Sequence, residues 1–417
     1  ETDVRAPVDL TRALKGLYKH AGERRTDRRK RIRELNRDQI DLLVETIRPE
    51  FDRLPSLSSR TADFSERTLS ATRDQYRFLD ASEASERLLC SGGAGTGKTF
   101  LAAESARREA AAGRTVTLVC HSSVLAGYIS GQAGMDHELI TVTPLSRLDA
   151  TTRCQSLVVD EGQDLMNHMD LASLDEHLED GLEDGRWRIF LDENNQAGVV
   201  GRFEQKAMEE VKGYSDSRFG LPENCRNTSN IIDEVTRSVG ADMGTPLTGM
   251  GEEPLWRFWT EPDEGAGALS NYLDDILGRG IEHHHITILT GNAPHQDPVI
   301  NALRKNLRAR FDMLTENSIL DRGPGSIGVA PIGLFKGLES LFVCVTDIPA
   351  LDGSLKEEGI NELYVAMSRA RAGLLLVLPD RLRSPIEELM RRTATEKDDA
   401  TEKDDATEKD DATEKDD

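Results

Sequence analysis

The sequence lacks any apolar run long enough to cross a membrane, and only 5% of its 417 residues are aromatic. A membrane-spanning helix needs about 20 apolar residues, so no membrane association is expected. The five cysteines are odd in number and include no CxxC pair. Disulfide frameworks and zinc ribbons use paired cysteines, so we expect buried, reduced thiols in a cytoplasmic protein.

The sequence also opens without Met and without a secretory leader, at ETDVRAPVDL, which suggests a processed chain or part of a longer one. Positive charge is scarce, since 52 Lys and Arg stand against 75 Asp and Glu, for a net charge of −23. Four ATEKDD copies at 394–417 carry −8 of that total. The remaining acidity lowers the expectation of nucleic-acid binding but leaves room for a local basic groove.

Short apolar runs alternate with helical patterns from about residue 70 onward. Buried parallel strands have continuous apolar runs of this kind, with crossover helices between them. Two sets of runs, with a break near 215–230, predict an α/β protein of two tandem doubly wound domains with parallel sheets. The expected strands are RLLCSG (87–92), TVTLVC (115–120), SLVVDE (156–161), RWRIFLDE (186–193), HITILTG (285–291), SIGVAPI (326–332), LFVCVTDIP (341–349) and GLLLVLPD (373–380).

Four regions are predicted along the chain. Residues 1–66 form a polar, helical N-terminal region with a basic cluster, which either contacts nucleic acid or a partner or is a solvated helix face. The first α/β domain is expected at 67–218 and the second at 219–392. Because the repeats have no apolar residue beyond alanine, 393–417 is predicted to be a disordered tail.

A glycine-rich segment, CSGGAGTGKTF, follows the first apolar run and precedes a helical pattern. Such a loop turns backbone N–H groups toward a phosphate at the N-terminus of the next helix. Lys98 is expected to reach the β- and γ-phosphates, and the Thr99 hydroxyl to bind Mg²⁺. The predicted nucleoside triphosphate loop comprises Gly92, Gly93, Ala94, Gly95, Thr96, Gly97, Lys98, Thr99 and Phe100.

Two carboxylates, Asp160 and Glu161, directly follow the apolar residues LVV. The carboxyl ends of parallel strands face the crevice where a nucleotide binds. We expect Asp160 to hold Mg²⁺ through water, and Glu161 to orient and deprotonate the attacking water. An ordinary acidic strand end is the alternative, and kinases, GTPases, AAA-type ATPases and helicases all remain open at this stage.

Motifs between residues 75 and 377 resemble, in order, those of superfamily 1 helicases of the UvrD/Rep-like kind. DEGQD (160–164) resembles the DEAQD box, FLDENNQA (190–197) the GDxxQ motif and LPENCRNTSNII (221–232) the NYRS motif. FKGLES (335–340) and LYVAMSRARAGLLLV (363–377) resemble the KGLE and YVAxTRA motifs. The resemblance implies two RecA-like domains that bind ATP and Mg²⁺ in the cleft between them, in a compact form without the large 1B and 2B insertions.

The resemblance also implies roles for single residues. Gln75 would read the adenine edge and Gln196 would sense the γ-phosphate. Arg226 and Arg369 would be the arginines that contact the transferring phosphoryl group.

Further residues are expected to link the nucleotide to the second domain and to nucleic acid. By resemblance, Lys336 to Glu339 pass near the ribose and the DNA backbone. We expect Gln163 and Asp164 to hydrogen-bond across the cleft toward the arginine-bearing segments, so that Gln163 belongs to the nucleotide site.

Two functions follow. The first is an ATP-dependent DNA helicase or single-stranded DNA translocase, with 3′ to 5′ direction implied only by the resemblance. Cys225 stands where the family has an aromatic that stacks on adenine, and Gly333 replaces a phosphate-contacting His. Several base-stacking platforms are also missing, so the second is a regulatory ATPase that gates a nuclease or other partner, in DNA repair or anti-phage defence.

Three other features have plainer interpretations. His283 to His285 are expected to be surface histidines, since no Cys or carboxylate partners them in register. Trp187, Trp256 and Trp259 are expected to pack in or beside strands. Residues 121–123, His-Ser-Ser, could hold a nucleic-acid phosphate. By resemblance TVTPLSRL (141–148) would be a DNA-contacting loop, and from its own residues it is interpreted as a Thr/Pro turn before a helix.

Overall fold

The computed structural model describes residues 75, 79–80, 84–149, 151–194, 202–349 and 357–395. The chain divides into two compact units, Glu1–Leu54 and Pro55–Asp417, and every described residue lies in the second. The predicted N-terminal region, 1–66, lies outside the described residues. So does the predicted tail except for 393–395, which end a helix that begins at residue 383 and so do not belong to a disordered segment.

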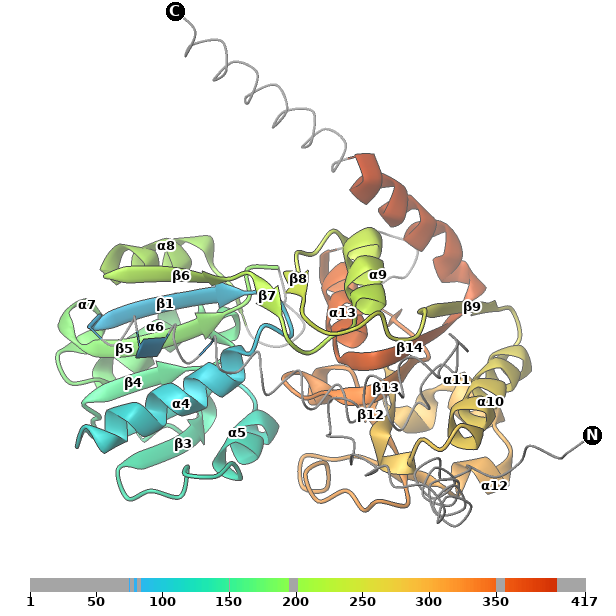
Figure 1. Cartoon of the computed structure of the whole chain (residues 1–417), viewed down its shortest axis with the longest axis horizontal. Helices are drawn as coiled ribbons and strands as arrows, with labels where there is room; N and C mark the ends of the chain where they lie inside the picture. The colour runs from blue at the N-terminus through green and yellow to red at the C-terminus, as the bar shows by residue number, and fades with distance from the viewer. Residues whose placement is uncertain are drawn as a thin grey trace, which may run out of the picture. The chain divides into compact units, whose positions relative to one another are not determined.

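The first sheet has six parallel strands in the order β3-β2-β4-β5-β1-β6 (Figure 1). Helices cover both of its faces, and a separate cluster of buried apolar side chains fills each interface. One cluster includes α4 (Lys98–Ala111) and α5 (Ser123–Ser130), and the other includes α6 (His168–His177), α7 (Gly181–Asp184) and α8 (Gln205–Tyr214). The strands are β1 (Arg87–Gly92), β2 (Val116–Cys120), β3 (Ile140–Pro144), β4 (Ser156–Val159), β5 (Arg186–Leu191) and β6 (Ser217–Leu221).

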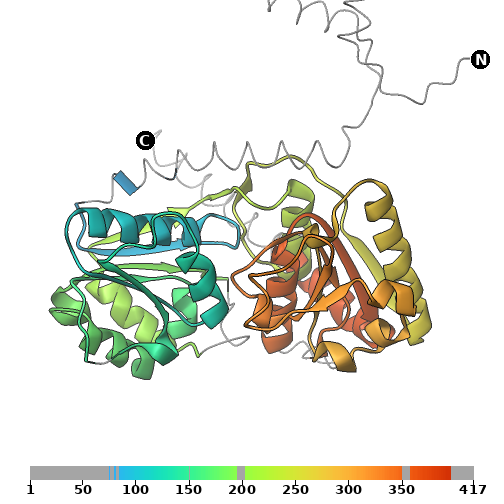
Figure 2. The ribbon, with the colours of Figure 1, turned by 90° about the horizontal axis from the view of Figure 1, so that it is seen from below.

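The second sheet is built in the same way, with six parallel strands in the order β11-β12-β10-β13-β14-β9. One face packs on α9 (Ser229–Val239) and α13 (Glu357–Ser368), and the other on α10 (Pro262–Gly278), α11 (Pro298–Ala302) and α12 (Lys305–Arg308), as Figure 2 shows from below. The strands are β9 (Leu255–Trp259), β10 (Ile286–Thr290), β11 (Phe311–Met313), β12 (Ile327–Pro331), β13 (Ser340–Val345) and β14 (Ala370–Pro379).

Short elements complete the described fold. A two-stranded ribbon, β7 (Glu223–Asn224) and β8 (Thr245–Pro246), follows the first sheet. The 3₁₀ turns are η1 (Leu145–Arg147), η2 (Gly162–Leu165), η3 (His283–His285), η4 (Pro294–Gln296), η5 (Gly333–Phe335) and η7 (Asp380–Leu382). No helix in the described ranges is long and apolar enough to cross a membrane.

All eight predicted strands are present. The strands not predicted are the four edges of the six-stranded sheets, β3, β6, β9 and β11, and the short pair β7 and β8. Residues 141–144 therefore belong to a strand and not to a turn, so the interpretation of TVTP was wrong. Central strands are buried on both faces, as all five residues of β2 are, whereas half-buried and exposed residues alternate along β6. An edge strand of this kind has no continuous apolar run for a sequence pattern to detect.

The structure also bears on three other sequence expectations, the domain boundary, the cysteines and the tryptophans. The predicted boundary between 218 and 219 falls inside β6, which pairs with β1 over residues 217–221 and so belongs to the first sheet. The five cysteines are buried and free, in agreement with the expectation. Trp187 is fully buried, while Trp256 and Trp259 lie in edge strand β9, so all three are packing residues.

Candidate active site

The glycine-rich loop connects β1 to α4, which confirms the predicted strand, loop and helix order. Gly95 and Gly97 have φ of +88° and +93°, in the left-handed region where side chains are strained. A Cβ at Gly95 would collide with Asn227, and one at Gly97 would collide with the side chain of Gln75. The loop therefore requires glycine both for its backbone conformation and for the close approach of its neighbours.

The Lys98 ammonium is held inside this loop. Its Nζ donates hydrogen bonds to the carbonyl oxygens of Gly92 (2.7 Å) and Gly93 (2.9 Å). It also lies 3.6 Å from Oδ2 of Asp192, which follows β5, and the Lys98 side chain is only 6% exposed. A buried cation at the N-terminus of a helix attracts an anion, so the loop is charged to receive phosphate.

Asp160 directly follows β4 and is fully buried, yet neither of its carboxylate oxygens has a partner in good hydrogen-bond geometry in the described chain, although the Thr99 hydroxyl and the Glu161 backbone N–H lie close to them. Burial, and then the neighbouring Glu161 charge, raise the pKa of Asp160 to about 7, although nearby Thr99 and Lys98 lower it in part. Leaving a buried acceptor without a partner costs about 1–3 kcal/mol. Such a group indicates a ligand that supplies the missing partner.

A magnesium ion fits this position. Hard divalent cations take oxygen ligands and usually bind through one or two carboxylates. Asp160 offers two free oxygens, and the Thr99 hydroxyl in the first turn of α4 lies near it. The residues present therefore match the donor set that the sequence predicted for Mg²⁺.

Glu161 has a backbone conformation that is rare for a residue with a side chain. Its φ of 53° and ψ of 44° lie in the left-handed region, where strain of about 1–3 kcal/mol is typical and clusters at functional sites. The next residue must be glycine, because a Cβ at Gly162 would lie 2.8 Å from Cγ2 of Ile189. This turn directs Glu161 away from the course of the strand.

The Glu161 carboxylate is kept anionic. Burial alone would raise its pKa, but the charges of Lys98, Lys336 and Arg369 outweigh burial and lower the pKa below its ordinary value. Gln163 Nε2 also donates to Glu161 Oε2. An ionised carboxylate beside the phosphate loop has the charge state that a general base needs.

Gln163 does not reach across toward the arginines, so that expectation was wrong. Besides its bond to Glu161, its Oε1 accepts a hydrogen bond of 3.0 Å from the backbone N–H of Asp192. Both partners belong to segments that follow strands of the first sheet. Gln163 therefore positions the Glu161 carboxylate relative to β5.

Asp164 does contact the second sheet's segments, but through a lysine. Its Oδ1 lies 2.5 Å from Nζ of Lys336, and both side chains are 4% exposed. Burial raises the pKa of Asp164 to about 7 despite the opposing Lys336 charge. This buried ion pair joins η2 to the turn that precedes β13.

The predicted arginines lie near Glu161 without touching it. Arg226 Nε is 2.5 Å from Oε2 of Glu339, and Arg371 Nη1 is 3.2 Å from Oε1 of the same carboxylate. The charges of Arg226 and Glu161 nevertheless act on each other. Glu339, expected near the ribose, thus bridges two guanidinium groups, and Arg371 was missed although it lies in the quoted motif 363–377.

Arg369 is only 1% exposed and is held by its own segment. Its guanidinium donates to the carbonyl oxygens of Val365 (3.1 Å) and Leu338 (3.4 Å) and to the Ser368 hydroxyl (2.9 Å). Its charge acts on Glu161 and on Asp192. The chain therefore brings Arg369 to the acidic strand ends of the first sheet.

Tyr364 on α13 is a site residue that the sequence analysis missed. Its hydroxyl accepts a 3.0 Å hydrogen bond from the Ala94 backbone N–H and donates a 3.1 Å bond to Oδ2 of Asp192. Its signal was its place as the Tyr of the quoted motif LYVAMSRARAGLLLV (363–377), five residues before Arg369. Tyr364 directly connects the second sheet's helix to the phosphate loop.

A cavity of about 650 Å³ opens beside the loop. Gln75 lines it and donates a 2.7 Å hydrogen bond to the Thr96 carbonyl, while Cys225 N–H donates to the Gly95 carbonyl (3.1 Å). The cavity is also lined by Gly97, Thr99, Phe100, Arg226 and Glu339. Seven of the seventeen predicted site residues thus line one cavity, whereas Lys98, Asp160 and Glu161 are not part of its lining and Gln196 lies outside the described residues.

A second cavity, of about 520 Å³, is lined by Glu161 and Asp164 from the turn after β4 and by Lys336. His121, Ser122 and Ser123 line it, although Ser122 also caps α5 and Ser123 Oγ donates to Glu316 (2.8 Å). Arg147 adds a positive charge, and no Phe, Tyr or Trp is among its described lining residues.

Comparisons with known proteins find structural likeness only. No protein-family model and no curated protein matches the chain. Its structural neighbours include arterivirus nonstructural protein 10, a helicase, which is 16% identical with a TM-score of 0.39 over 69% of this chain and 59% of that one. The same helicase in complex with DNA is 15% identical, with a TM-score of 0.37 over 69% of this chain and 60% of that one.

A third neighbour is the C-terminal domain of a possible DNA helicase from Lactobacillus plantarum. It is 18% identical with a TM-score of 0.28, and the match covers 37% of this chain and 86% of that domain. The chain spans about three fifths of the arterivirus helicase. Because every TM-score is below 0.5, the likeness carries no argument for function, and the case for function rests on the chain's own side chains.

Proposed function

We propose that the chain is an ATP-dependent DNA helicase or single-stranded DNA translocase of the UvrD-like superfamily 1 type, with two RecA-like domains. One observation carries the proposal. The buried Asp160 carboxylate has no hydrogen-bond partner among the described residues, and it lies beside Lys98 and Thr99 of a phosphate-type loop. A purely structural carboxylate would have partners at this depth.

The residues suit phosphoryl transfer to water. Loop N–H groups and Lys98 bind the phosphates, and Thr99 with Asp160 holds the cation, which when bound neutralises phosphate charge. Glu161, anionic and oriented by Gln163, accepts a proton from the attacking water.

The arginines act from the second sheet. The positive charges of Arg226 and Arg369 already act on the Glu161 carboxylate, although each arginine is bound to other partners. An arginine that stabilises the transferring phosphoryl group contributes a factor of about 10³ to 10⁵ in rate. Hydrolysis then depends on how closely the second sheet's segments approach the loop.

Two contacts are suited to couple the nucleotide to motion. Tyr364 binds both the loop amide of Ala94 and Asp192, and Lys336 binds Asp164. A nucleotide phosphate that accepts a hydrogen bond from the Ala94 amide competes with Tyr364 for that amide. A nucleic-acid strand that binds Lys336 competes with Asp164 for the lysine. Each ligand therefore biases contacts on which the other depends, as two-site coupling requires.

The second cavity is the candidate nucleic-acid site. Arg147, Lys336 and the hydroxyls of Ser122 and Ser123 offer contacts for phosphate oxygens. The absence of aromatic side chains from its described lining removes base stacking, which is worth about 1–3 kcal/mol per base. Binding here would rest on phosphate contacts and would weaken steeply with salt.

The same lack of aromatics favours a second candidate function, a regulatory ATPase that gates a nuclease or another partner without processive unwinding. In that case, the Lys336–Asp164 pair transmits the nucleotide state to a protein instead of a strand. A nuclease partner would have to be identified by its interaction with the chain.

The test is the ATPase rate with and without single-stranded DNA over a salt series, with Lys98→Ala as the background. Stimulation that fades steeply with salt supports a motor that grips phosphates. Lys98-dependent hydrolysis without stimulation at any salt favours the regulatory ATPase. If the wild-type rate equals that of Lys98→Ala, the proposed ATP site is overturned.

A further inference from the structure

Three side chains of types that can bind a metal lie together outside the proposed ATP site. Glu282, His284 and His285 each offer a ligand atom, and the three atoms lie within 4.8 Å of one another. We propose that they form a binding site for a zinc-class divalent transition metal. The sequence interpretation of plain surface histidines assumed that no carboxylate was in register, and Glu282 is that carboxylate.

The local backbone explains the grouping. Glu282 caps the 3₁₀ turn η3, and His285 N–H donates a 3.0 Å hydrogen bond to the Glu282 carbonyl. A 3₁₀ helix has three residues per turn, so side chains at i and i+3 eclipse. Glu282 and His285 therefore share a face, His284 joins them, and His283 is not part of the group.

The turn is held in place on both sides. Arg322 Nη2 donates to the carbonyl oxygens of His283 (2.8 Å) and Ile286, and the Ser340 hydroxyl donates to the His285 carbonyl (3.0 Å). Directly afterwards, β10 begins at Ile286 in the middle of the second sheet. Ligands on a fixed turn need little ordering when a metal binds.

The spacing suits tetrahedral coordination. Bonds of about 2.1 Å at tetrahedral angles place two ligand atoms about 3.4 Å apart. Nδ1 of His284 lies 3.3 Å from Oε2 of Glu282, yet this nitrogen is buried and forms no hydrogen bond in the described structure. The His284 and His285 rings lie 4.0 Å apart between centroids, so side-chain rotation can bring the third ligand atom into place.

The donor set selects the kind of metal. Two imidazoles and one carboxylate suit zinc and neighbouring transition metals, whereas Mg²⁺ and Ca²⁺ prefer oxygen ligands. Arg322 and Arg371 bring two guanidinium charges near His285. The two guanidinium charges oppose a cation, so binding weaker than at a closed four-ligand site is expected.

The proposed metal site adjoins the cavity beside the glycine-rich loop. His284 and His285 line the 650 Å³ cavity beside Gly95 and Gly97. With three protein ligands, a bound metal keeps a fourth position for water or another ligand, as in open zinc sites.

The experiment titrates Zn²⁺ into the full chain against a chromogenic chelator, in the presence of excess Mg²⁺. Expected is one site per chain that His284→Ala and His285→Ala each weaken at least about 10-fold, in line with the loss of a direct ligand. His283→Ala, the neighbouring histidine outside the group, should bind Zn²⁺ as the wild type does.

Asp160→Asn tests whether zinc binds at the predicted magnesium position instead. It should keep the zinc site, and loss of binding in this variant would overturn the assignment. Equal affinity in the wild type and in His284→Ala, or equal weakening by His283→Ala, would also overturn it. Circular dichroism of each variant without metal checks that the chain is folded in every comparison.

Discussion

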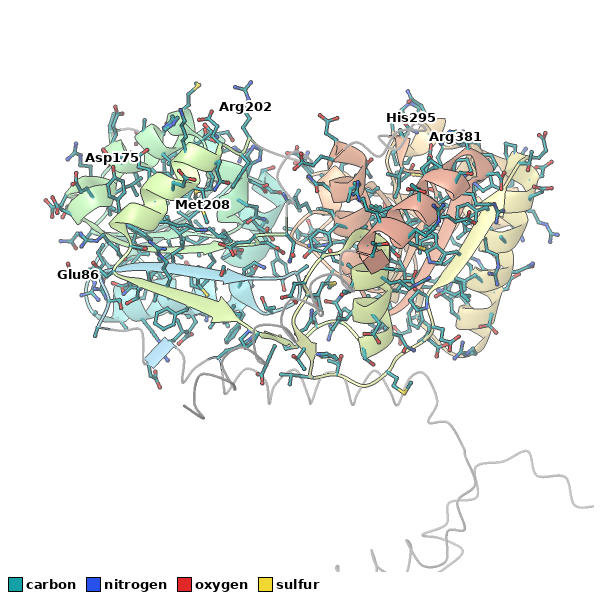
Figure 3. All side chains as sticks on the ribbon, turned by 90° about the horizontal axis from the view of Figure 1, so that it is seen from above. Glu86, Asp175, Arg202, Met208, His295 and Arg381 are labelled. Carbon is teal, nitrogen blue, oxygen red and sulfur yellow. The ribbon has the colours of Figure 1, made fainter. Side chains whose placement is uncertain are left out.

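The carboxyl ends of the two sheets carry similar buried aspartates with opposite surroundings. Asp160 after β4 and Asp347 after β13 are 0% and 5% exposed. Asp347 accepts hydrogen bonds from Asn292 Nδ2 (3.1 Å), the Ile348 amide (2.8 Å) and exposed Arg381 (3.0 Å, Figure 3), whereas Asp160 accepts none from the described residues.

The difference separates a structural carboxylate from a ligand-binding one. Burial raises the pKa of both groups, so burial alone does not distinguish them. What distinguishes them is that the fold supplies partners for Asp347 and leaves both oxygens of Asp160 available. Under the proposed function, Asp160 of the first sheet therefore binds a ligand, whereas Asp347 of the second sheet has a structural role.

The largest effect is expected from the arginine that the second sheet contributes to the first. Arg369→Ala should lower ATP turnover by a factor of about 10³ to 10⁵ and leave nucleotide binding mostly intact, because it removes charge stabilisation of the transferring phosphoryl group. Steady-state ATPase and fluorescent-nucleotide binding measure the two properties. Arg369→Lys, which keeps the charge, controls for loss of the buried hydrogen bonds, and near-normal turnover in Arg369→Ala would refute the two-sheet site.

Glu109 on α4 extends the comparison to a fully paired carboxylate. Its oxygens lie 2.7 Å from Arg186 Nε and 3.3 Å from Arg188 Nη2, and 2.5 Å from Arg114 Nε. Burial raises its pKa, but the bond to Arg186 and the charges of Arg188 and Arg186 outweigh it, so the pKa lies below 4.5. A lowered folded-state pKa contributes stability above about pH 4.5 that is lost as the pH falls through the folded value.

Glu109→Gln should therefore destabilise the chain by about 2 kcal/mol at neutral pH and flatten the fall in stability below pH 4.5. Chemical unfolding at a series of pH values measures this. A variant that retains the full acid dependence of the wild type would show that the pairing has no energetic role.

Asp347→Ala should cost about 1–2 kcal/mol of stability, because it leaves the Asn292 amide and the Ile348 N–H without their acceptor. ATPase activity under folded conditions should be unchanged. Thermal unfolding and ATPase rates check the two halves of this expectation. A large loss of ATPase activity with unchanged stability would show that Asp347 is not a purely structural carboxylate, in contrast to what is proposed for Asp160.

The smallest effect on basal turnover is expected at the contact between the two sheets' segments. Asp164→Asn removes the negative partner of the buried Lys336 while keeping the side chain's size, so stability should fall by about 3–5 kcal/mol. Basal hydrolysis by the folded variant should change little, and DNA stimulation should change by a few fold. Gln163→Ala should instead lower basal hydrolysis, since Gln163 contacts Glu161. ATPase assays with and without DNA separate the two, and the reverse pattern would restore the coupling role first expected of Gln163.

The sequence predicted those features of the fold that depend on a single continuous segment. Central strands, the phosphate loop and the position of Asp160 follow from contiguous residues, such as the fully buried run of β2. Edge strands were missed because almost all of their residues are half-buried or exposed, so they lack the fully buried run of a central strand. Long-range partners, such as Tyr364 with Asp192 and Lys336 with Asp164, depend on how distant segments pack and leave no local pattern.

Gln163 shows the same limit within a short segment. Its direction depends on the left-handed turn at Glu161, a conformation that residue identity does not predict for a glutamate. The turn points Gln163 toward Asp192 and leaves Asp164 to face Lys336. Spacing alone placed both side chains in the cleft and could not assign their partners.

The most direct test is a matched pair of substitutions, Asp160→Asn and Asp347→Asn, assayed for Mg²⁺-dependent ATPase activity and thermal stability. The account predicts that Asp160→Asn lowers turnover at least about 100-fold and keeps or raises stability without Mg²⁺, because a buried charge without partners is removed. Asp347→Asn should retain turnover. Normal Mg²⁺-dependent turnover in Asp160→Asn, or its loss in folded Asp347→Asn, would contradict the account.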